Sequence, residues 1–184
     1  MRFSAVLAVA LAQAVSAPTP ERNLDLRSVL NNDAALSSIE VLYSVEGEVI
    51  AVRGDGTVLK QSTRQRLSLL PTCRGTVAST DVRHLLEVMV AAHFLDLPQK
   101  SYMLLNEDWR TLQMHSISIK AAGWIAKRDF SSGEYDGKTR EIPQNFAQVE
   151  NAIIDLESKA IPPETRCTVA QPLLPENKRA VATP

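Results

Sequence analysis

The sequence lacks the short motifs that most often mark a catalytic or metal-binding site. Its three histidines, His84, His93 and His115, show neither the H-E-x-x-H pattern nor the i, i+4 spacing of a helical zinc site. There is no G-x-S-x-G nucleophile elbow, no lysine-containing phosphate loop and no EF-hand spacing. The sequence therefore predicts no cofactor and no metal. It favours a protein without catalytic machinery, with an enzyme whose site is unrecognised as the alternative.

The chain also lacks an excess of charge of either sign. Lys and Arg together number 20 and Asp and Glu number 21, which gives a net charge of −1. Surfaces that bind nucleic acid or anionic membranes carry clustered basic side chains, and no long basic run is present. We therefore expect neither nucleic acid nor a membrane surface as a partner.

One long apolar run is present, and it lies near the start of the chain. Arg2 precedes the run AVLAVALA at residues 5–12, and small residues follow up to Ala17. This order is typical of a secretory signal peptide over residues 1–17, with cleavage after Ser16 or Ala17. The run is shorter than the roughly 20 apolar residues of a membrane span. We expect a secreted, extracellular protein without a membrane span after signal removal, with the periplasm as the alternative location.

Only two cysteines, Cys73 and Cys167, are available for cross-linking. Disulfides persist in exported proteins, and we expect an exported chain with two cysteines to pair them. The sequence therefore predicts a disulfide between Cys73 and Cys167, with two unpaired thiols as the alternative.

The strongest helical pattern covers residues 79–97. Its apolar stripe has the spacing of an amphipathic helix and consists of Val82, Leu85, Leu86, Met89, Val90 and His93. A second helix is predicted from Pro143, with the seam Phe146, Val149, Ile153 and Leu156. His84 lies opposite the first stripe and is expected in solvent, whereas His93 is expected to be a hydrogen-bonded core residue.

Alternating apolar residues predict strands at residues 39–45 and 113–120. The segments between predicted turns indicate further strands at 48–53, 57–61 and 124–130, and a short strand within 67–77. Gly54, Asp55 and Gly56 predict a tight hairpin turn. His115 shares a strand face with two isoleucines, so it is expected to be a hydrogen-bonded core residue as well. The polar run SSGEYDGK at residues 131–138 predicts a loop.

These elements predict an α+β fold, because hairpin connections imply a mainly antiparallel sheet and two amphipathic helices can cover one of its faces. The 184 residues fit one domain with tails. We expect a mobile leader at residues 18–37, an α+β domain at 38–160 and a proline-rich tail at 161–184. We also expect a monomer.

The order of these elements resembles that of small exported microbial domains of unknown function. The run EVIAVRGDGTV is followed by a Ser/Thr-capped helix that closes in HFLDLP, then by a hairpin and a last helix. The matching residues are Asp55, Gly56, Phe94 and Leu97, and the resemblance covers roughly residues 38–157. The same layout is similar to emfourin-type inhibitors of thermolysin-like metalloproteinases. This resemblance implies a domain that binds a proteinase.

Aromatic and acidic residues gather in two predicted loops that flank the last hairpin. Residues 106–110 precede its first strand and residues 131–138 follow its second strand, so both loops should meet at one end of the sheet. Tyr and Trp are enriched where proteins bind partners. The predicted binding residues are Glu107, Asp108, Trp109, Glu134, Tyr135 and Asp136.

The leading hypothesis is a non-catalytic module that binds another protein through this patch, with a proteinase as one candidate partner. The alternatives are an orphan enzyme and a structural component of an envelope or wall. For the patch itself, two solvated loops are an alternative. A weak calcium site is another, formed by Glu107 and Asp108, or by Asp129 with Glu134 and Asp136.

Overall fold

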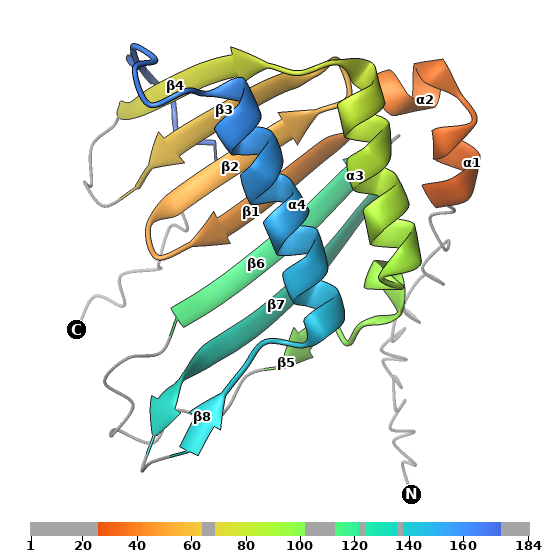
Figure 1. Ribbon diagram of the computed structural model, residues 1–184, viewed down its shortest axis with the longest axis vertical. Coiled ribbons are helices and arrows are strands. Elements are labelled where there is room, and N and C mark those ends of the chain that lie inside the picture. The colour runs from red at the N-terminus through yellow and green to blue at the C-terminus, as the bar shows by residue number, and fades with distance from the viewer. Residues whose placement is uncertain (1–25, 64–68, 102–112, 122–123, 136–137, 174–184) are drawn as a thin grey trace, which may run out of the picture.

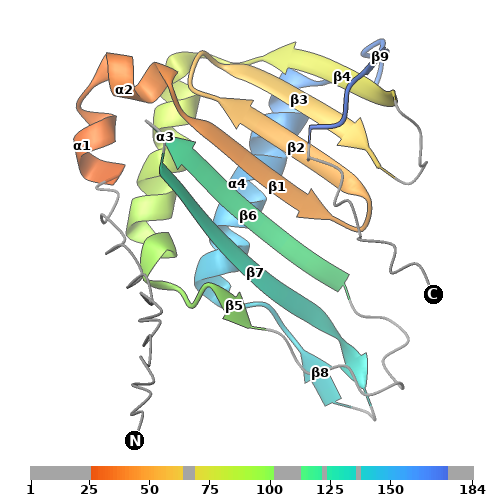
Figure 2. The same ribbon diagram turned by 180° about the vertical axis from the view of Figure 1, so that it is seen from behind.

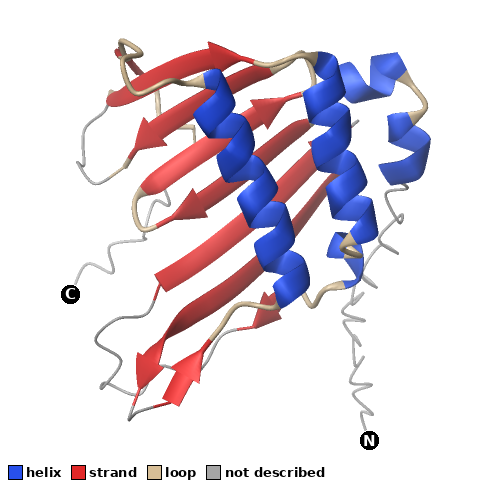
Figure 3. Cartoon of the chain, viewed as in Figure 1, coloured by secondary structure: helices blue, strands red, loops and turns tan. Residues whose placement is uncertain are grey.

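The computed structural model describes residues 26–63, 69–101, 113–121, 124–135 and 138–173, and the predicted signal peptide lies outside them. The described chain forms two layers. Helices α3 (Ser79–Ala91) and α4 (Gln144–Ala160) pack against each other on one face of a sheet (Figures 1 and 3). Seen from behind, the opposite face of the sheet carries no described helix (Figure 2). The described helices are all too short and polar to cross a membrane.

The sheet is built mainly from neighbouring hairpins. Its strands are β1 (Glu40–Val45), β2 (Glu48–Arg53), β3 (Thr57–Ser62), β4 (Leu70–Thr76), β5 (Lys100–Ser101), β6 (Gln113–Ala121), β7 (Trp124–Tyr135), β8 (Lys138–Arg140) and β9 (Thr168–Ala170). Their order in space is β5-β7-β6-β1-β2-β3-β4-β9, and β8 pairs with β7. Among the described pairings only β5–β7 is parallel. The prediction of an α+β fold with a mainly antiparallel sheet is therefore confirmed.

The core lies between the sheet and its two covering helices. Alternation along β1 and β6 turns Val41, Ile117 and Ile119 towards the helices, where all three are fully buried. The apolar stripes of α3 and α4 meet them with Leu85 and Phe146, which are also fully buried. The predicted stripes thus mark the buried faces of both helices.

The predicted turn at Gly54, Asp55 and Gly56 connects β2 to β3. The Asp55 carboxylate accepts a hydrogen bond of 2.8 Å from the Thr57 backbone N–H, and Gly56 has a left-handed backbone with φ of 84°. A Cβ atom on Gly54 would lie 1.7 Å from the Leu36 carbonyl oxygen, so the turn also needs glycine for close packing.

The predicted helix at residues 79–97 is shorter than expected. It ends as α3 at Ala91, His93 takes a left-handed backbone with φ of 49°, and the 3₁₀ turn η1 (Phe94–Asp96) follows. The prediction of a core position for His93 is wrong, because its side chain is 70% exposed and pairs with Asp96 at 3.1 Å. The left-handed backbone at His93 ends the helical repeat, so Phe94 is buried against the core and His93 is not. His84 is exposed, as predicted.

The prediction of a loop is also wrong for residues 131–135 and 138, whereas residues 136–137 lie outside the described residues. Strand β7 continues through Ser131, which is buried, and Ser132 pairs with Gln113 of β6. Tyr135 then pairs with Lys138 of β8. Pairing with a neighbouring strand overrides the loop-like composition of this segment.

The described part of the predicted leader is helical. Helices α1 (Leu26–Leu30) and α2 (Asp33–Ser37) bury Leu26, Val29 and Leu36 against the core. Asn32 caps α2 by accepting hydrogen bonds of 3.0 and 3.1 Å from two backbone N–H groups. Residues 26–37 are thus held by packing and capping, unlike the mobile leader that their composition predicts.

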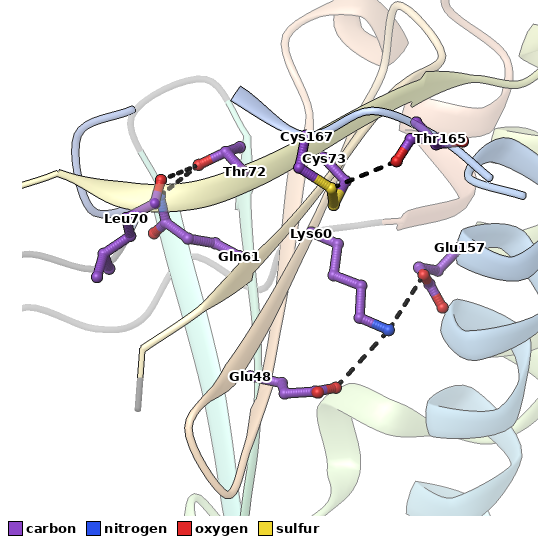
Figure 4. Close-up of a disulfide and its surroundings, with 9 residues drawn as sticks. All are labelled: Glu48, Lys60, Gln61, Leu70, Thr72, Cys73, Glu157, Thr165 and Cys167. Atoms are coloured by element: carbon purple, nitrogen blue, oxygen red, sulfur yellow. Dashed lines mark hydrogen bonds and ion pairs between the residues drawn. A yellow bond between two sulfur atoms is a disulfide. The ribbon is translucent and has the colours of Figure 1, made fainter. Parts of the chain in front are cut away.

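The segment after α4 returns to the edge of the sheet. Cys167 forms the predicted disulfide with Cys73 of β4, with 4.1 Å between their Cα atoms, and β9 then pairs with β4 (Figure 4). Beyond β9, the buried side-chain amide of Gln61 donates a hydrogen bond of 2.9 Å to the Gln171 carbonyl oxygen. It also accepts a hydrogen bond of 2.7 Å from the Leu173 backbone N–H. The start of the predicted tail is therefore part of the fold.

Candidate functional site

The predicted binding patch is described in part. Glu107, Asp108, Trp109 and Asp136 lie outside the described residues, and so does the side chain of Tyr135. Glu134 lies on β7 and is exposed. The Gln113–Ser132 pairing places the start of β6 and the outer part of β7 at one end of the sheet. The patch itself stays a prediction.

Four polar side chains form a hydrogen-bonded chain at this same end of the sheet. The Tyr43 hydroxyl donates to Glu150 Oε1, and the same oxygen lies 2.9 Å from His115 Nδ1. His115 Nε2 lies 2.9 Å from Ser132 Oγ. Tyr43, His115 and Glu150 are buried, whereas Ser132 is half-buried. This series of hydrogen bonds thus runs from the interface between sheet and helix towards the surface.

Each member is positioned by the period of its own element. His115 and Ser132 lie on the helix-facing side of β6 and β7, two residues from the buried Ile117 and Phe130 respectively. Glu150 lies between the buried Val149 and Ile153 on α4. The helix therefore presents a carboxylate to the sheet where an apolar side chain would otherwise pack.

The surroundings of Glu150 favour its ionised form. Burial acts to raise the pKa of this carboxyl, but the hydrogen bonds from His115 and Tyr43 outweigh burial, and the pKa is lowered. Burial and the bond to Glu150 raise the pKa of Tyr43, so Tyr43 keeps its proton and remains a donor. A carboxylate only accepts, so His115 Nδ1 carries the proton of this hydrogen bond.

The sequence indicates only part of this site. His115 is predicted to be a hydrogen-bonded core residue, and this is confirmed. Glu150 and Glu157 both fall beside the apolar seam of α4, and this position is a sequence signal for buried carboxylates. Ser132 lies in the segment predicted to be a loop, and nothing local indicates that it faces a histidine.

The second buried carboxylate of α4 belongs to a structural ion pair. Lys60 Nζ lies 3.2 Å from Glu157 Oε1 and 3.7 Å from Glu48 Oε2, close to the disulfide (Figure 4). This lysine joins β2, β3 and α4. The buried carboxylate of Glu157 therefore has a cationic partner.

The described residues do not form a metal centre. No group of three or more His, Cys, Asp or Glu side chains among them could hold a metal ion. The positions of Asp129 and Glu134 of the suggested calcium cluster differ by an odd number on β7, which places the two side chains on opposite faces of the strand. Asp129 is buried and lies 3.0 Å from Lys127 Nζ.

No family model matches this chain, and no curated protein matches it in sequence. Its function is therefore inferred from the geometry of its own residues.

Proposed function

We propose that the protein is an exported module that binds another protein through the β7–β8 hairpin, with a proteinase as one candidate partner. The observation that supports this proposal is the shape of the hairpin. Strand β7 has 12 residues, and its end with β8 projects beyond the start of α4 (Figures 1 and 3). A projecting hairpin can enter a groove that a flat surface cannot reach.

The hairpin also includes two of the six residues that the sequence assigns to the binding patch, Glu134 and Tyr135. Its base is rigid because β7 pairs with β6 from Trp124 to Ser132. Binding segments are commonly held by such a scaffold, since a rigid segment loses less entropy when it is ordered by a partner.

A proteinase fits this shape for two reasons. Proteinase active sites are clefts that accept extended chain, and a hairpin presents its backbone in that form. The layout of residues 38–157 is also similar to that of emfourin-type inhibitors. We therefore expect the mature protein to lower the activity of a thermolysin-like metalloproteinase on a peptide substrate, and Tyr135→Ala to weaken this inhibition.

A photo-crosslinking experiment tests the binding function without assuming the partner. A benzophenone amino acid replaces Tyr135 in one variant and Ile154, an exposed residue of α4, in the control variant. In the native medium, the variant at position 135 should crosslink one protein that the control does not. Equal crosslinking from both positions, or none from position 135, would contradict binding through the hairpin.

An enzyme is the second candidate function, and one observation favours it: a serine, a histidine and a carboxylate in hydrogen-bonded sequence. The third candidate, a structural envelope or wall component, has no described feature that favours it over the other two.

A further inference from the structure

We infer that Ser132 is a nucleophile activated by His115, and that it takes the acyl group of small carboxylic esters. This activity goes beyond the proposed binding function, and each can hold without the other. The inference depends on the mutual geometry of Ser132, His115 and Glu150, and on the position of Ser132 at the surface end of this chain of contacts.

The distances match those of a nucleophile, a general base and a group that orients the base. Ser132 Oγ and His115 Nε2 are 2.9 Å apart, and His115 Nδ1 and Glu150 Oε1 are also 2.9 Å apart. Both values lie within the roughly 2.6–3.2 Å expected of such an arrangement. The ring is thus held on one side by the carboxylate while its other nitrogen faces the hydroxyl.

The direction of the hydrogen bonds suits base catalysis. Because Glu150 accepts from Nδ1–H, a neutral His115 has its lone pair on Nε2, where it accepts the Ser132 proton. Tyr43 donates to the same carboxylate oxygen and fixes its position.

The nucleophile is the most accessible member of the set. His115 and Glu150 are less than a tenth exposed, whereas Ser132 is half-buried at the point where β7 leaves the body as the projecting hairpin. A substrate can therefore approach the hydroxyl while the base stays shielded from water. This access suits a small ester better than a folded protein.

Gln113 is the candidate donor for the developing oxyanion. It faces Ser132 directly across the β6–β7 pair and is exposed. Residues opposite each other in an antiparallel pair have Cβ atoms about 4.5–5.5 Å apart, on the same face. Its side-chain amide can therefore reach the carbonyl oxygen of an ester that is attacked by Ser132.

Hydrolysis of the ester needs water as its only co-reactant. Ser132 Oγ bonds to the carbonyl carbon while His115 Nε2 takes the hydroxyl proton. The carbon–oxygen bond to the alcohol then breaks, and the alcohol leaves with that proton. Water attacks the acyl-serine by the same route, which releases the carboxylic acid and restores the serine.

A fluorophosphonate probe and an aryl acetate test this inference on the mature protein. The probe forms an oxygen–phosphorus bond and releases hydrogen fluoride, so labelling is read by intact mass and mapped to a residue. We expect one label on Ser132, and turnover of the acetate that falls at least about 100-fold in Ser132→Ala, the lower end of what base catalysis contributes.

The matched control is Ser131→Ala, because Ser131 is the adjacent serine and points to the other face of β7. It should keep both label and turnover. Gln113→Ala should keep slow labelling and lose turnover. An unlabelled, inactive protein with native circular dichroism would overturn the inference, and so would a label that persists in folded Ser132→Ala. Crosslinking from position 135 should be unchanged in Ser132→Ala. A failure of the esterase inference can therefore be told apart from a failure of the proposed binding function.

Discussion

Glu150 shows how a single residue can join two layers of the protein. It occupies a position on α4 that faces the sheet, and it is less than a tenth exposed. A buried carboxylate without partners is costly, but Tyr43 and His115 both donate to this one. Whatever chemistry Ser132 performs, Glu150 therefore also contributes to stability.

That contribution should depend on pH. The pKa of Glu150 is lower in the folded chain than its ordinary value of 4.5, so the folded state gains stability when Glu150 is ionised. This gain is present above the unfolded pKa and is lost as the pH falls through the folded pKa. The free energy of unfolding should therefore drop below about pH 5, and less steeply in Glu150→Gln.

Urea unfolding of the wild type and the variant across a series of pH values measures this difference. Tyr43→Phe removes one of the two donors to Glu150 and should give an intermediate dependence. Parallel curves for all three proteins would show that Glu150 does not contribute to the acid response.

Gly54 is a second position where one residue has a large effect. A Cβ atom there would lie 1.7 Å from the Leu36 carbonyl oxygen, so Gly54→Ala must displace α2 or the turn. We expect a loss of about 1–3 kcal/mol in the free energy of unfolding, as for other overpacked sites. Thermal or urea unfolding checks the value. Since the clash involves backbone, adding Leu36→Ala should not relieve it, and recovery in the double variant would contradict this explanation.

At the scale of elements, local periodicity predicts much of this fold. The apolar run between the glycine turns at residues 47 and 54 predicts β2 with its observed bounds, and the stripe around Leu85 and Leu86 predicts the buried face of α3. The hairpin formed by β7 and β8 is missed, because residues 131–135 have the composition of a loop and gain their strand structure from pairing with β6 and β8.

The candidate site is less predictable than the elements that hold it. Alternation places His115 on the buried face, but its partners Glu150 and Ser132 are 35 and 17 residues away. Their meeting depends on the β6–β7 register and on the rotation of α4. Neither quantity is set by a local pattern, so one member of the site is predicted and its partners are not.

Three phenylalanine rings pack together where α4 meets its neighbouring elements. The Phe146 ring centroid lies 4.9 Å from that of Phe130 on β7 and 6.4 Å from that of Phe94 on η1. Phe146→Ala should lower the free energy of unfolding by about 3–5 kcal/mol, because it leaves a cavity where three elements meet.

The control for this change is Phe146→Leu, which fills more of the space and should cost clearly less, with both measured by urea unfolding. Equal costs for Ala and Leu would show that the ring contacts, rather than the filled volume, stabilise this junction.

At the scale of the whole molecule, the disulfide joins parts of the chain that are 94 residues apart. A closed loop of this length restricts the unfolded chain, and its removal should cost about 2–4 kcal/mol. We expect this loss in a variant with both Cys73→Ser and Cys167→Ser. Reduced wild type should unfold at a similar urea concentration, whereas equal stability of the oxidised and reduced proteins would contradict the prediction.

The same covalent loop determines what happens to the protein when a proteinase cuts it once. It encloses α3, α4 and the projecting hairpin, which is the part that a partner proteinase would reach first. A single cut in the hairpin should therefore leave both fragments attached to each other, and the strands on either side of the cut stay paired with the rest of the sheet. The nicked protein should migrate as one band on a denaturing gel without reductant and as two with it, so one cleavage event would not release the module into pieces.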